Sequence, residues 1–290
     1  MMRSMMIIID DLYVFSREGS KFTFTTCGAT GANGPTMQQC FTHYQMKWVR
    51  NEEYFGMSRN GIQELKIYFS GIYHIKVSGA GTKIAGAIVS AKFKLRKGTT
   101  LYIAVGQTGQ ISLGGSGGTF VAVKKSEKFE PLIIAGGAGV SFSYKEFARG
   151  SADESGNRSC TTKSQNIFSG HSGQSGCSKR YNGGGGFYGQ IQTKKWDNYE
   201  SLPKSFQSGM TGGQARNAQG GFGGGGHGPG GGGGGYTGGH GGLDTDSGGG
   251  GSFIEPHNSV EEKKLSIGHI GAGKCEIELL RFIGSELCMP

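Results

Sequence analysis

The chain has 290 residues, of which 58 are glycine and 6 are proline, and its formal net charge at pH 7 is +9. Collagen is excluded, because the glycines follow no G-X-Y register and proline is scarce. The positive charge favours an anionic partner, whether a nucleic acid, an acidic polysaccharide or a membrane surface.

The first 21 residues show no clear pattern of a folded element. MMRSMMIIIDDLYVF has one arginine and a short apolar patch at residues 5–9, with no small-residue cleavage site after it. No stretch of the sequence reaches the roughly 18 apolar residues of a membrane span. We expect residues 1–21 to be a truncated or disordered segment, and the chain to be either a complete protein or a fragment.

Short apolar runs broken by glycine predict β-strands from residue 62 to residue 135. In IYHIKVSG, Tyr73, Ile75 and Val77 alternate with polar side chains, which is the period of a half-buried strand. TTLYIAVG, GTFVAV and PLIIAGG follow at close spacing, and SFIEP, KKLSIGHI and CEIELLRFIG come near the C-terminus. Helix is scarcely expected, because no long stretch keeps a 3.6-residue period without glycine.

This pattern predicts an all-β fold, an antiparallel β-sandwich or jelly roll. Strands are expected in 22–140 and 252–282, so that 22–282 forms one domain. The polar and glycine-rich stretch 141–251 is an insertion between strands of that domain, and 283–290 is a tail.

The glycine tract Gln219–Gly242, QGGFGGGGHGPGGGGGGYTGGHGG, has two interpretations. A disordered linker is favoured by composition, because glycine loses more conformational freedom on folding than any other residue. An ordered array of polyglycine II rods is the alternative, since bare backbones pack closely and hydrogen-bond in several directions. The breaks between glycine clusters suit rods joined by turns: Phe222, His227, Tyr236 and His240.

An RNA-binding glycine region would interleave arginine with glycine to supply phosphate affinity and stacking. Here no lysine or arginine occurs between Arg216 and Lys263. The sequence therefore makes nucleic acid an unfavoured partner, and a glycine-rich RNA-binding protein is kept only as an alternative function.

GHIGAGKC, residues 268–275, nearly matches the phosphate-binding loop GxxxxGK[ST]. Its last position is Cys275, and the following CEIELLRFIG alternates like a strand, whereas a phosphate loop must open a helix. A glycine turn between two strands is the preferred interpretation.

No set of nucleophile, base and stabiliser is found, so we expect no catalytic residues and no cofactor. His227 and His240 could together bind a metal, but solvated histidines are the default expectation, and no metal site is predicted.

Six cysteines, at positions 27, 40, 160, 177, 275 and 288, include no CxxC pair. Disulfides between Cys27 and Cys40 and between Cys160 and Cys177 would each close a short loop. Reduced buried thiols of a cytosolic protein are the alternative. Asn157 begins a glycosylation sequon, which matters only if the protein is secreted.

FTTCGATGANGPTMQQC, residues 24–40, resembles the start of the glycine-rich extracellular domain of the anaplastic lymphoma kinase and leukocyte tyrosine kinase receptors. Similar blocks continue in order through residue 280: GIYHIKVSGAG, TLYIAVGQTGQ, PLIIAGGAG, GGFGGGGHGPGGGGGGYTGG and GGGGSFIEP. The resemblance implies a TNF-like β-sandwich into which a bundle of polyglycine II helices is inserted. It also implies an extracellular or cell-surface location.

In those receptors the domain binds small basic cytokines, and binding dimerises the receptor. The matching ligand contacts are Tyr236, Asp244 and Asp246. This sequence has no VAIK-type lysine, HRD or DFG motif, no EGF-like segment and no span, so only an ectodomain-like module is indicated. We therefore expect a non-enzymatic recognition module for a protein ligand, with a ligand-induced dimer possible. The alternative is a secreted adhesive or structural protein that meets an acidic glycan.

Overall fold

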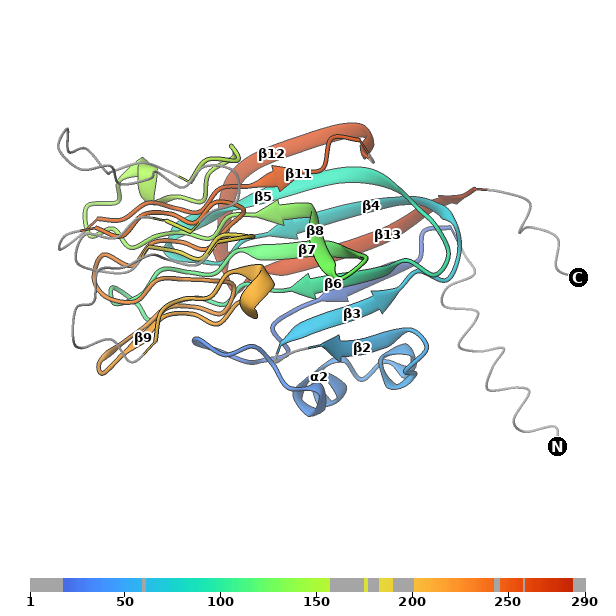
Figure 1. The fold of residues 1–290 in the computed structure, drawn as a ribbon, viewed down its shortest axis with the longest axis horizontal. Coiled ribbons are helices and arrows are strands. Elements are labelled where there is room, and N and C mark those ends of the chain that lie inside the picture. Colours follow the sequence, from blue (N-terminus) through green and yellow to red (C-terminus); the bar gives the residue numbers. More distant parts are fainter. Residues whose placement is uncertain are drawn as a thin grey trace, which may run out of the picture.

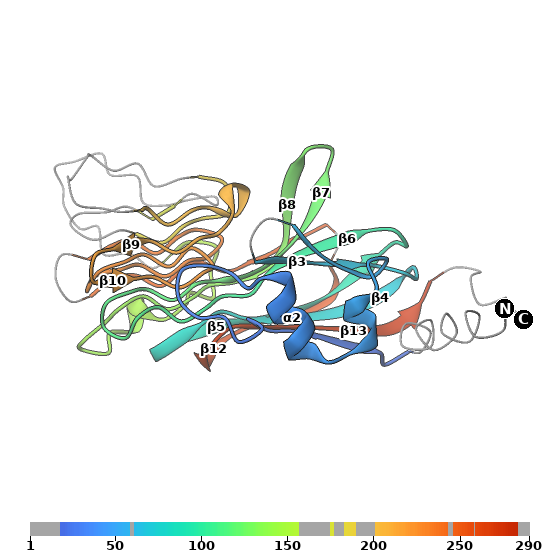
Figure 2. The ribbon, with the colours of Figure 1, turned by 90° about the horizontal axis from the view of Figure 1, so that it is seen from below.

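The computed structural model describes residues 18–58, 61–156, 175–176, 183–189, 201–242, 246–257 and 259–283. Two antiparallel β-sheets pack face to face in a sandwich (Figures 1 and 2). The predicted all-β antiparallel sandwich is therefore confirmed. One sheet has the order β1 (Lys21–Phe24), β13 (Lys274–Phe282), β4 (Gly71–Ser78), β5 (Gly81–Leu95) and β12 (Ser259–Gly271). The other has the order β11 (Phe253–Ile254), β8 (Lys128–Ala135), β7 (Thr119–Lys125), β6 (Thr100–Ala104), β3 (Ile62–Lys66) and β2 (Phe55–Ser58).

The main core lies between the two sheets and follows the alternation read from the sequence. On β4, Tyr73, Ile75 and Val77 are buried, whereas Lys76 between them is exposed. They meet apolar side chains of the facing sheet such as Leu101 of β6. Burial of these side chains is the main favourable term that holds the sheets together.

A helix, α2 (Met37–Tyr44), forms where none was expected. It begins with a capping box: the Gln39 amide donates to Thr36 Oγ1 at 3.2 Å, and the Thr36 amide donates to Gln39 Oε1 at 2.8 Å. The T-x-x-Q spacing that signals this box is visible in TMQQ. Short 3₁₀ turns are also present: η1 (Lys47–Arg50), η2 (Glu146–Ala148) and η3 (Phe206–Ser208).

The predicted disulfide between Cys27 and Cys40 is present, and it ties the segment after β1 to α2. Cys275 is a free thiol buried in the main core, and burial raises its pKa. Cys160, Cys177 and the sequon residue Asn157 lie outside the described residues.

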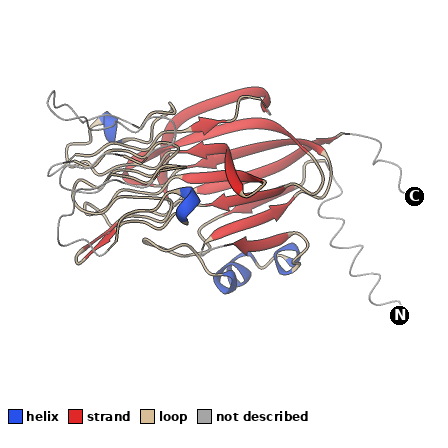
Figure 3. Cartoon of the chain, in the orientation of Figure 1, coloured by secondary structure: helices blue, strands red, loops and turns tan. Residues whose placement is uncertain are grey.

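The glycine-rich segments lie side by side at one end of the sandwich, beyond the strands (Figure 3). We call these segments the glycine array: residues 106–118, 136–141, 183–187, 220–242 and 247–252. A two-stranded hairpin of β9 (Gln214–Ala215) and β10 (Ala218–Gln219) lies beside it.

Backbone hydrogen bonds join the segments of the glycine array to one another. The amide of Gly115 donates to the Gly226 carbonyl at 2.7 Å, and that of Gly137 donates to the Gly234 carbonyl at 2.8 Å. The Gly233 amide donates to Gly248 at 2.9 Å. Because distant parts of the chain satisfy one another's backbone groups, the described part of the tract is ordered and is not a slack linker.

The array is possible only because it lacks side chains. A Cβ atom on Gly117 would lie 1.7 Å from the Phe222 carbonyl oxygen, and one on Gly249 would lie 1.8 Å from that of Arg149. Neither backbone could give way without losing its own hydrogen bonds. Glycine is therefore required here by close approach of backbones.

An apolar cluster fastens the array to the six-stranded sheet. Phe187 and Phe206 stack at 5.0 Å between ring centroids, and Phe206 lies 5.6 Å from Phe120 of β7. Phe222 is also fully buried in this cluster. The aromatic breaks in the glycine tract thus supply the apolar burial that glycine itself cannot.

His227 and His240 are buried, at 1% and 5% exposure, so the expectation of solvated histidines is wrong. Desolvation lowers the pKa of His227 to about 4. The tight backbone packing around the array encloses side chains that composition alone would place in water. In the segment 268–275, β12 ends at Gly271 and β13 begins at Lys274, so residues 272–273 form the turn between two strands that was preferred over a phosphate loop.

We predict that Gly117→Ala destabilises the protein by at least ~2 kcal/mol, because the added methyl group must displace backbone. Chemical denaturation monitored by circular dichroism measures the change. Gly56→Ala on β2 is the control, since its Cβ would first meet the Glu64 side chain, at 3.3 Å. The control should stay within ~1 kcal/mol of the parent protein. Equal stability of the two variants would contradict the close-packing explanation.

The buried His227 should make stability depend on pH. Its folded pKa of about 4 lies below the unfolded value of 6.5, so only the unfolded chain gains a proton between these values. Stability is expected to fall by on the order of 3 kcal/mol as pH drops from 6.5 to 4. His227→Gln should remove this part of the slope, whereas His257→Gln at an exposed turn should leave it unchanged. Denaturation at a series of pH values measures the slopes, and identical slopes would refute the assignment.

Candidate functional site

Exposed apolar side chains are concentrated on β12 and on the segment that follows β8. Nine large hydrophobic residues are exposed in the described ranges, and four of them lie on β12 while two lie in the segment after β8. We call these six residues the apolar edge: Val260, Leu265, Ile267, Ile270, Phe142 and Tyr144. Clustering of this kind marks interaction sites, whereas scattered exposed residues need no explanation.

The apolar edge arises because the sandwich does not close over β12. Leu265 and Ile267 pair with Val89 and Ala87 of β5, which are fully buried and belong to the core. On β12 the corresponding side chains are 42% and 43% exposed. The matching edge strand of the other sheet, β11, has only two residues and cannot cover the thirteen of β12. The face of β12 that adjoins the buried face of β5 is therefore exposed to solvent.

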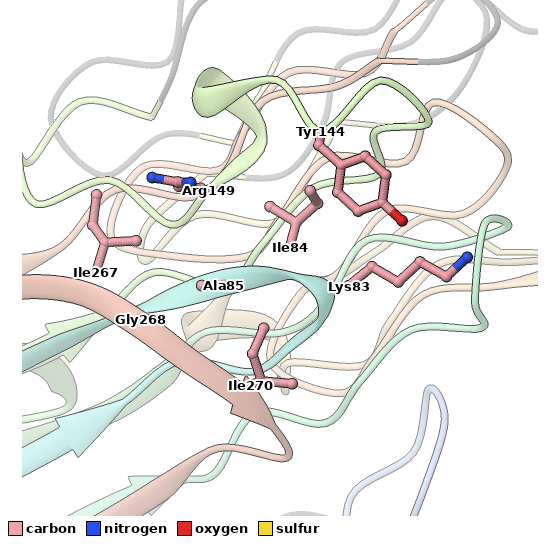
Figure 4. Close-up of a pocket in the computed structure, with 8 residues that line it drawn as sticks. All are labelled: Lys83, Ile84, Ala85, Tyr144, Arg149, Ile267, Gly268 and Ile270. Carbon is pink, nitrogen blue, oxygen red and sulfur yellow. The ribbon is translucent and has the colours of Figure 1, made fainter.

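A shallow open pocket lies where β12, the start of β5 and the segment 141–149 meet (Figure 4). Its apolar lining comes from Ile84, Ile267 and Ile270, and Tyr144 stands beside Lys83 at one side. Arg149 lies on the side of Ile267. The pocket therefore combines an apolar surface with two cationic side chains.

Tyr144 is held in an unusual backbone conformation. Its φ of 55° is left-handed, which is a genuine outlier for a bulky residue, and its side chain is 59% exposed. Strained, exposed residues persist only where their surroundings fix them, and they cluster at functional sites.

Asp246 fixes the turn that carries Tyr144. Ser141 Oγ donates to Asp246 Oδ1 at 2.5 Å, and Ser143 Oγ donates to Oδ2 at 3.0 Å. The Lys145 amide in turn donates to Ser141 Oγ at 3.0 Å. The carboxylate is thus part of the support of the pocket, and these charge-assisted hydrogen bonds join the glycine array to the segment 141–149.

Tyr236, the other described residue of the predicted ligand contacts, lies elsewhere in the fold. Its ring stacks on Phe253 of β11 at 4.4 Å between centroids, and the residue is 8% exposed. Burial raises the pKa of its hydroxyl to about 12. Asp244 lies outside the described residues. The ligand-contact role of these three residues stays a prediction, and the packing of Tyr236 gives it a clear structural role.

The described residues contain no group of three or more histidine, cysteine or acidic side chains placed to hold a metal ion. No helix within the described ranges is both long and apolar enough to cross a bilayer.

Sequence reasoning identified Asp246 but missed the pocket beside it. Tyr144 sits in SFSYKEF, which has no recognisable motif, and its backbone angle cannot be read from the letters. KKLSIGHI did predict a strand with apolar positions. Which of its faces would be left uncovered depends on the length of β11, so only the assembled sheets reveal it.

Comparison with known proteins shows a distant relationship to a receptor. No protein-family model matches the chain. A stretch of 103 residues is 34% identical to the leukocyte tyrosine kinase receptor of Mus musculus. The match covers 32% of this chain and 12% of the receptor, so the chain corresponds to a small part of that protein's length. This similarity indicates a distant relation to the receptor's ectodomain.

We predict that Asp246→Ala loosens the segment 141–149. Ser141 is 9% exposed, so loss of its acceptor leaves a nearly buried hydroxyl unpaired and costs ~1–3 kcal/mol. Hydrogen–deuterium exchange should show faster exchange of amides 141–149 in this variant. Asp153→Ala, at an exposed position nearby, is the control and should not change that exchange. Unchanged protection in Asp246→Ala would show that the carboxylate does not support the turn.

Proposed function

We propose that this chain is a non-catalytic recognition module of an extracellular or cell-surface protein, and that it binds a protein ligand at the apolar edge. One observation carries the proposal: Tyr144 is exposed in a left-handed conformation, on a turn anchored by Asp246, and lines the same pocket as the exposed Ile270. A rigid aromatic residue next to uncovered aliphatic ones is typical of the anchors at protein interfaces.

Two further observations support an extracellular module. The disulfide between Cys27 and Cys40 is compatible with an oxidising compartment. The distant similarity to the leukocyte tyrosine kinase receptor is compatible with a receptor-like role. If this chain acts in a receptor, it would bind the ligand, and a separate kinase domain would transmit the signal.

The finer architecture belongs to the same proposal. We infer that the sandwich is of the TNF-like jelly-roll type and that the glycine array is a bundle of polyglycine II rods. Hydrogen bonding of each rod to several neighbours supports this view, as with Gly115 to Gly226 and Gly226 to Gly232. Such a bundle would act as a stiff support for Asp246 and, through it, for Tyr144.

The charges of the pocket restrict how a ligand would bind. Lys83 and Arg149 favour an acidic group on the ligand, set beside an apolar one that reaches Ile84. The small basic cytokine-like factor implied by the resemblance would have to direct its basic side chains elsewhere, towards the acidic loop of Asp244 and Asp246. Binding of that kind could also dimerise the protein.

A second candidate function is adhesion to an acidic glycan. It is favoured by the same two cations and by the net charge of +9. A secreted structural or adhesive protein would use this contact without any signalling partner. RNA binding is a third and weaker possibility, because the glycine tract lacks cations.

The test is direct binding of the full chain, secreted with its disulfide intact, to a small basic cytokine of the kind that binds the animal receptors. We expect Tyr144→Ala and Ile270→Ala each to weaken binding at least tenfold, since anchors of this kind contribute ~1–2 kcal/mol or more. Ile111→Ala is the matched control, because Ile111 is 62% exposed and does not line the pocket. Biolayer interferometry measures the affinities.

Heparin and a single-stranded RNA oligonucleotide serve as counter-probes in the same assay. Salt-sensitive binding of heparin alone would replace the protein-ligand proposal by the adhesive one, and binding of RNA alone would replace both. Cytokine binding that tolerates both pocket variants would contradict the assignment of the site.

A further inference from the structure

A second concave surface lies at the hairpin of β9 and β10, and it shares no residue with the pocket of Tyr144. It is open to solvent and has a volume of about 380 Å³, which is within the range of small-molecule sites. Its lining consists of the hairpin, residues 214–219, and of Gln110 from the glycine array. The hairpin lies beside the array in the part of the molecule that carries the glycine-rich segments (Figure 2).

Carboxamide side chains dominate this surface, which we call the amide pocket. Its polar lining is formed by four carboxamides and one guanidinium group: Gln110, Gln214, Asn217, Gln219 and Arg216. Within the described part of the chain, no hydrogen bond or ion pair occupies these five side chains. Their donors and acceptors are therefore open to water or to a ligand.

The backbone beneath the amide pocket is fixed by hydrogen bonds. The Gln110 amide donates to the Gln219 carbonyl at 2.8 Å, and the Gln214 amide donates to the Ser201 carbonyl at 2.9 Å. In the hairpin itself, Gln219 lies opposite Gln214. Gly31 leaves room for the Gln219 carboxamide, because a Cβ atom there would lie 2.8 Å from Oε1. The side chains thus project from a preorganised surface, which reduces the entropy cost of binding.

The composition of the lining restricts the class of ligand. Each carboxamide presents two donors and an acceptor, which suits hydroxyl groups because they both donate and accept. Ala215 and Ala218 supply the apolar part of the lining, so a hydrophobic ligand would bury little surface. The described lining has no carboxylate to attract a cation, and Arg216 is a single positive charge, which suits a polyanion poorly. A compact molecule with several hydroxyl groups fits these properties best.

We propose that the amide pocket is a saccharide-binding site. The ring hydroxyls of the sugar bond to the carboxamides, and its C–H groups meet the methyl groups of Ala215 and Ala218. Arg216 donates to a further hydroxyl, or to the carboxylate of a sugar acid. Because the lining has no aromatic ring on which the sugar could stack, a single saccharide should bind with a Kd on the order of 1 mM.

This site goes beyond the proposed function, because it uses other residues and another kind of ligand. It also differs from the acidic-glycan contact of the second candidate function, which depends on Lys83 and Arg149 of the other pocket. Failure of saccharide binding would leave the protein-ligand site unaffected, and failure of cytokine binding would leave the amide pocket unaffected.

Titration of the full chain, with its disulfide intact, tests the proposal. The probes are the methyl glycosides of glucose, galactose, mannose, N-acetylglucosamine and glucuronic acid. Proton–nitrogen NMR spectra resolve the side-chain NH₂ groups of glutamine and asparagine, and each signal is assigned by its loss in an alanine variant. We expect at least one glycoside to shift the signals of the four lining carboxamides with a common saturation curve. A neutral glycoside or the glucuronoside would each support the site, and their relative affinities show which group Arg216 binds.

Substitutions at exposed lining residues locate the site. Gln110→Ala and Asn217→Ala should each weaken glycoside binding roughly fivefold, because each removes one or two hydrogen bonds to the sugar. Gln38→Ala removes an exposed carboxamide of α2 and is the matched control, with parent-like affinity expected. Lys83→Ala should also bind as the parent does, which separates this site from the acidic-glycan contact. Circular dichroism checks that every variant keeps the parent fold.

Three results would overturn the proposal. The first is that none of the five glycosides shifts the lining carboxamide signals at concentrations on the order of tens of millimolar. The second is that the Gln38 signal shifts as much as those of the lining residues, since this would indicate unspecific contact with sugar. The third is parent-like affinity of both Gln110→Ala and Asn217→Ala.

Discussion

The whole arrangement depends on contact between bare backbones in the glycine array. Cβ atoms would collide with carbonyl oxygens at positions such as Gly117 and Gly249, so segments far apart in sequence approach only because they lack side chains. Their amides and carbonyls then satisfy one another across the array, as with Gly233 and Gly248. The large entropy cost of ordering glycine is offset collectively by these bonds and by the buried phenylalanines, and no single segment would be stable alone.

Support for the candidate site follows from this packing. Ser247 and its neighbours in the array place Asp246 beside Ser141, and the carboxylate holds the turn that exposes Tyr144. The aliphatic half of the pocket has a different origin, because it comes from β12 and β5 of the sandwich. The pocket thus forms at the junction of a rigid glycine-rich body and a conventional β-sheet. Binding surfaces held by rigid elements lose little entropy when a ligand arrives.

Several features could be predicted from the sequence, and particular residues show why other features could not. The alternation of Tyr73, Ile75 and Val77 predicted both a strand and its buried face, because side-chain period is a local property. The capping box of Thr36 and Gln39 was also readable, but the short helix lacked a long 3.6-residue period and was missed. The solvent exposure of His227 was predicted wrongly. Glycine neighbours indicate an exposed side chain only when no other segment packs against them. The ligand contacts implied by the resemblance stay predictions, and one of them, Tyr236, is largely buried against Phe253.

By itself the sequence determined the fold class, one disulfide and the glycine positions, because strand alternation, cysteine spacing and the lack of a Cβ are properties of short stretches of chain. Only the tertiary structure decided that the tract is ordered, that β12 is a free edge, and that Tyr144, Lys83 and Arg149 meet at one pocket. Each of these features depends on which segments, distant in the sequence, pack against one another. The lengths of the strands and the packing of the two sheets decide which surfaces are buried and which stay exposed to solvent.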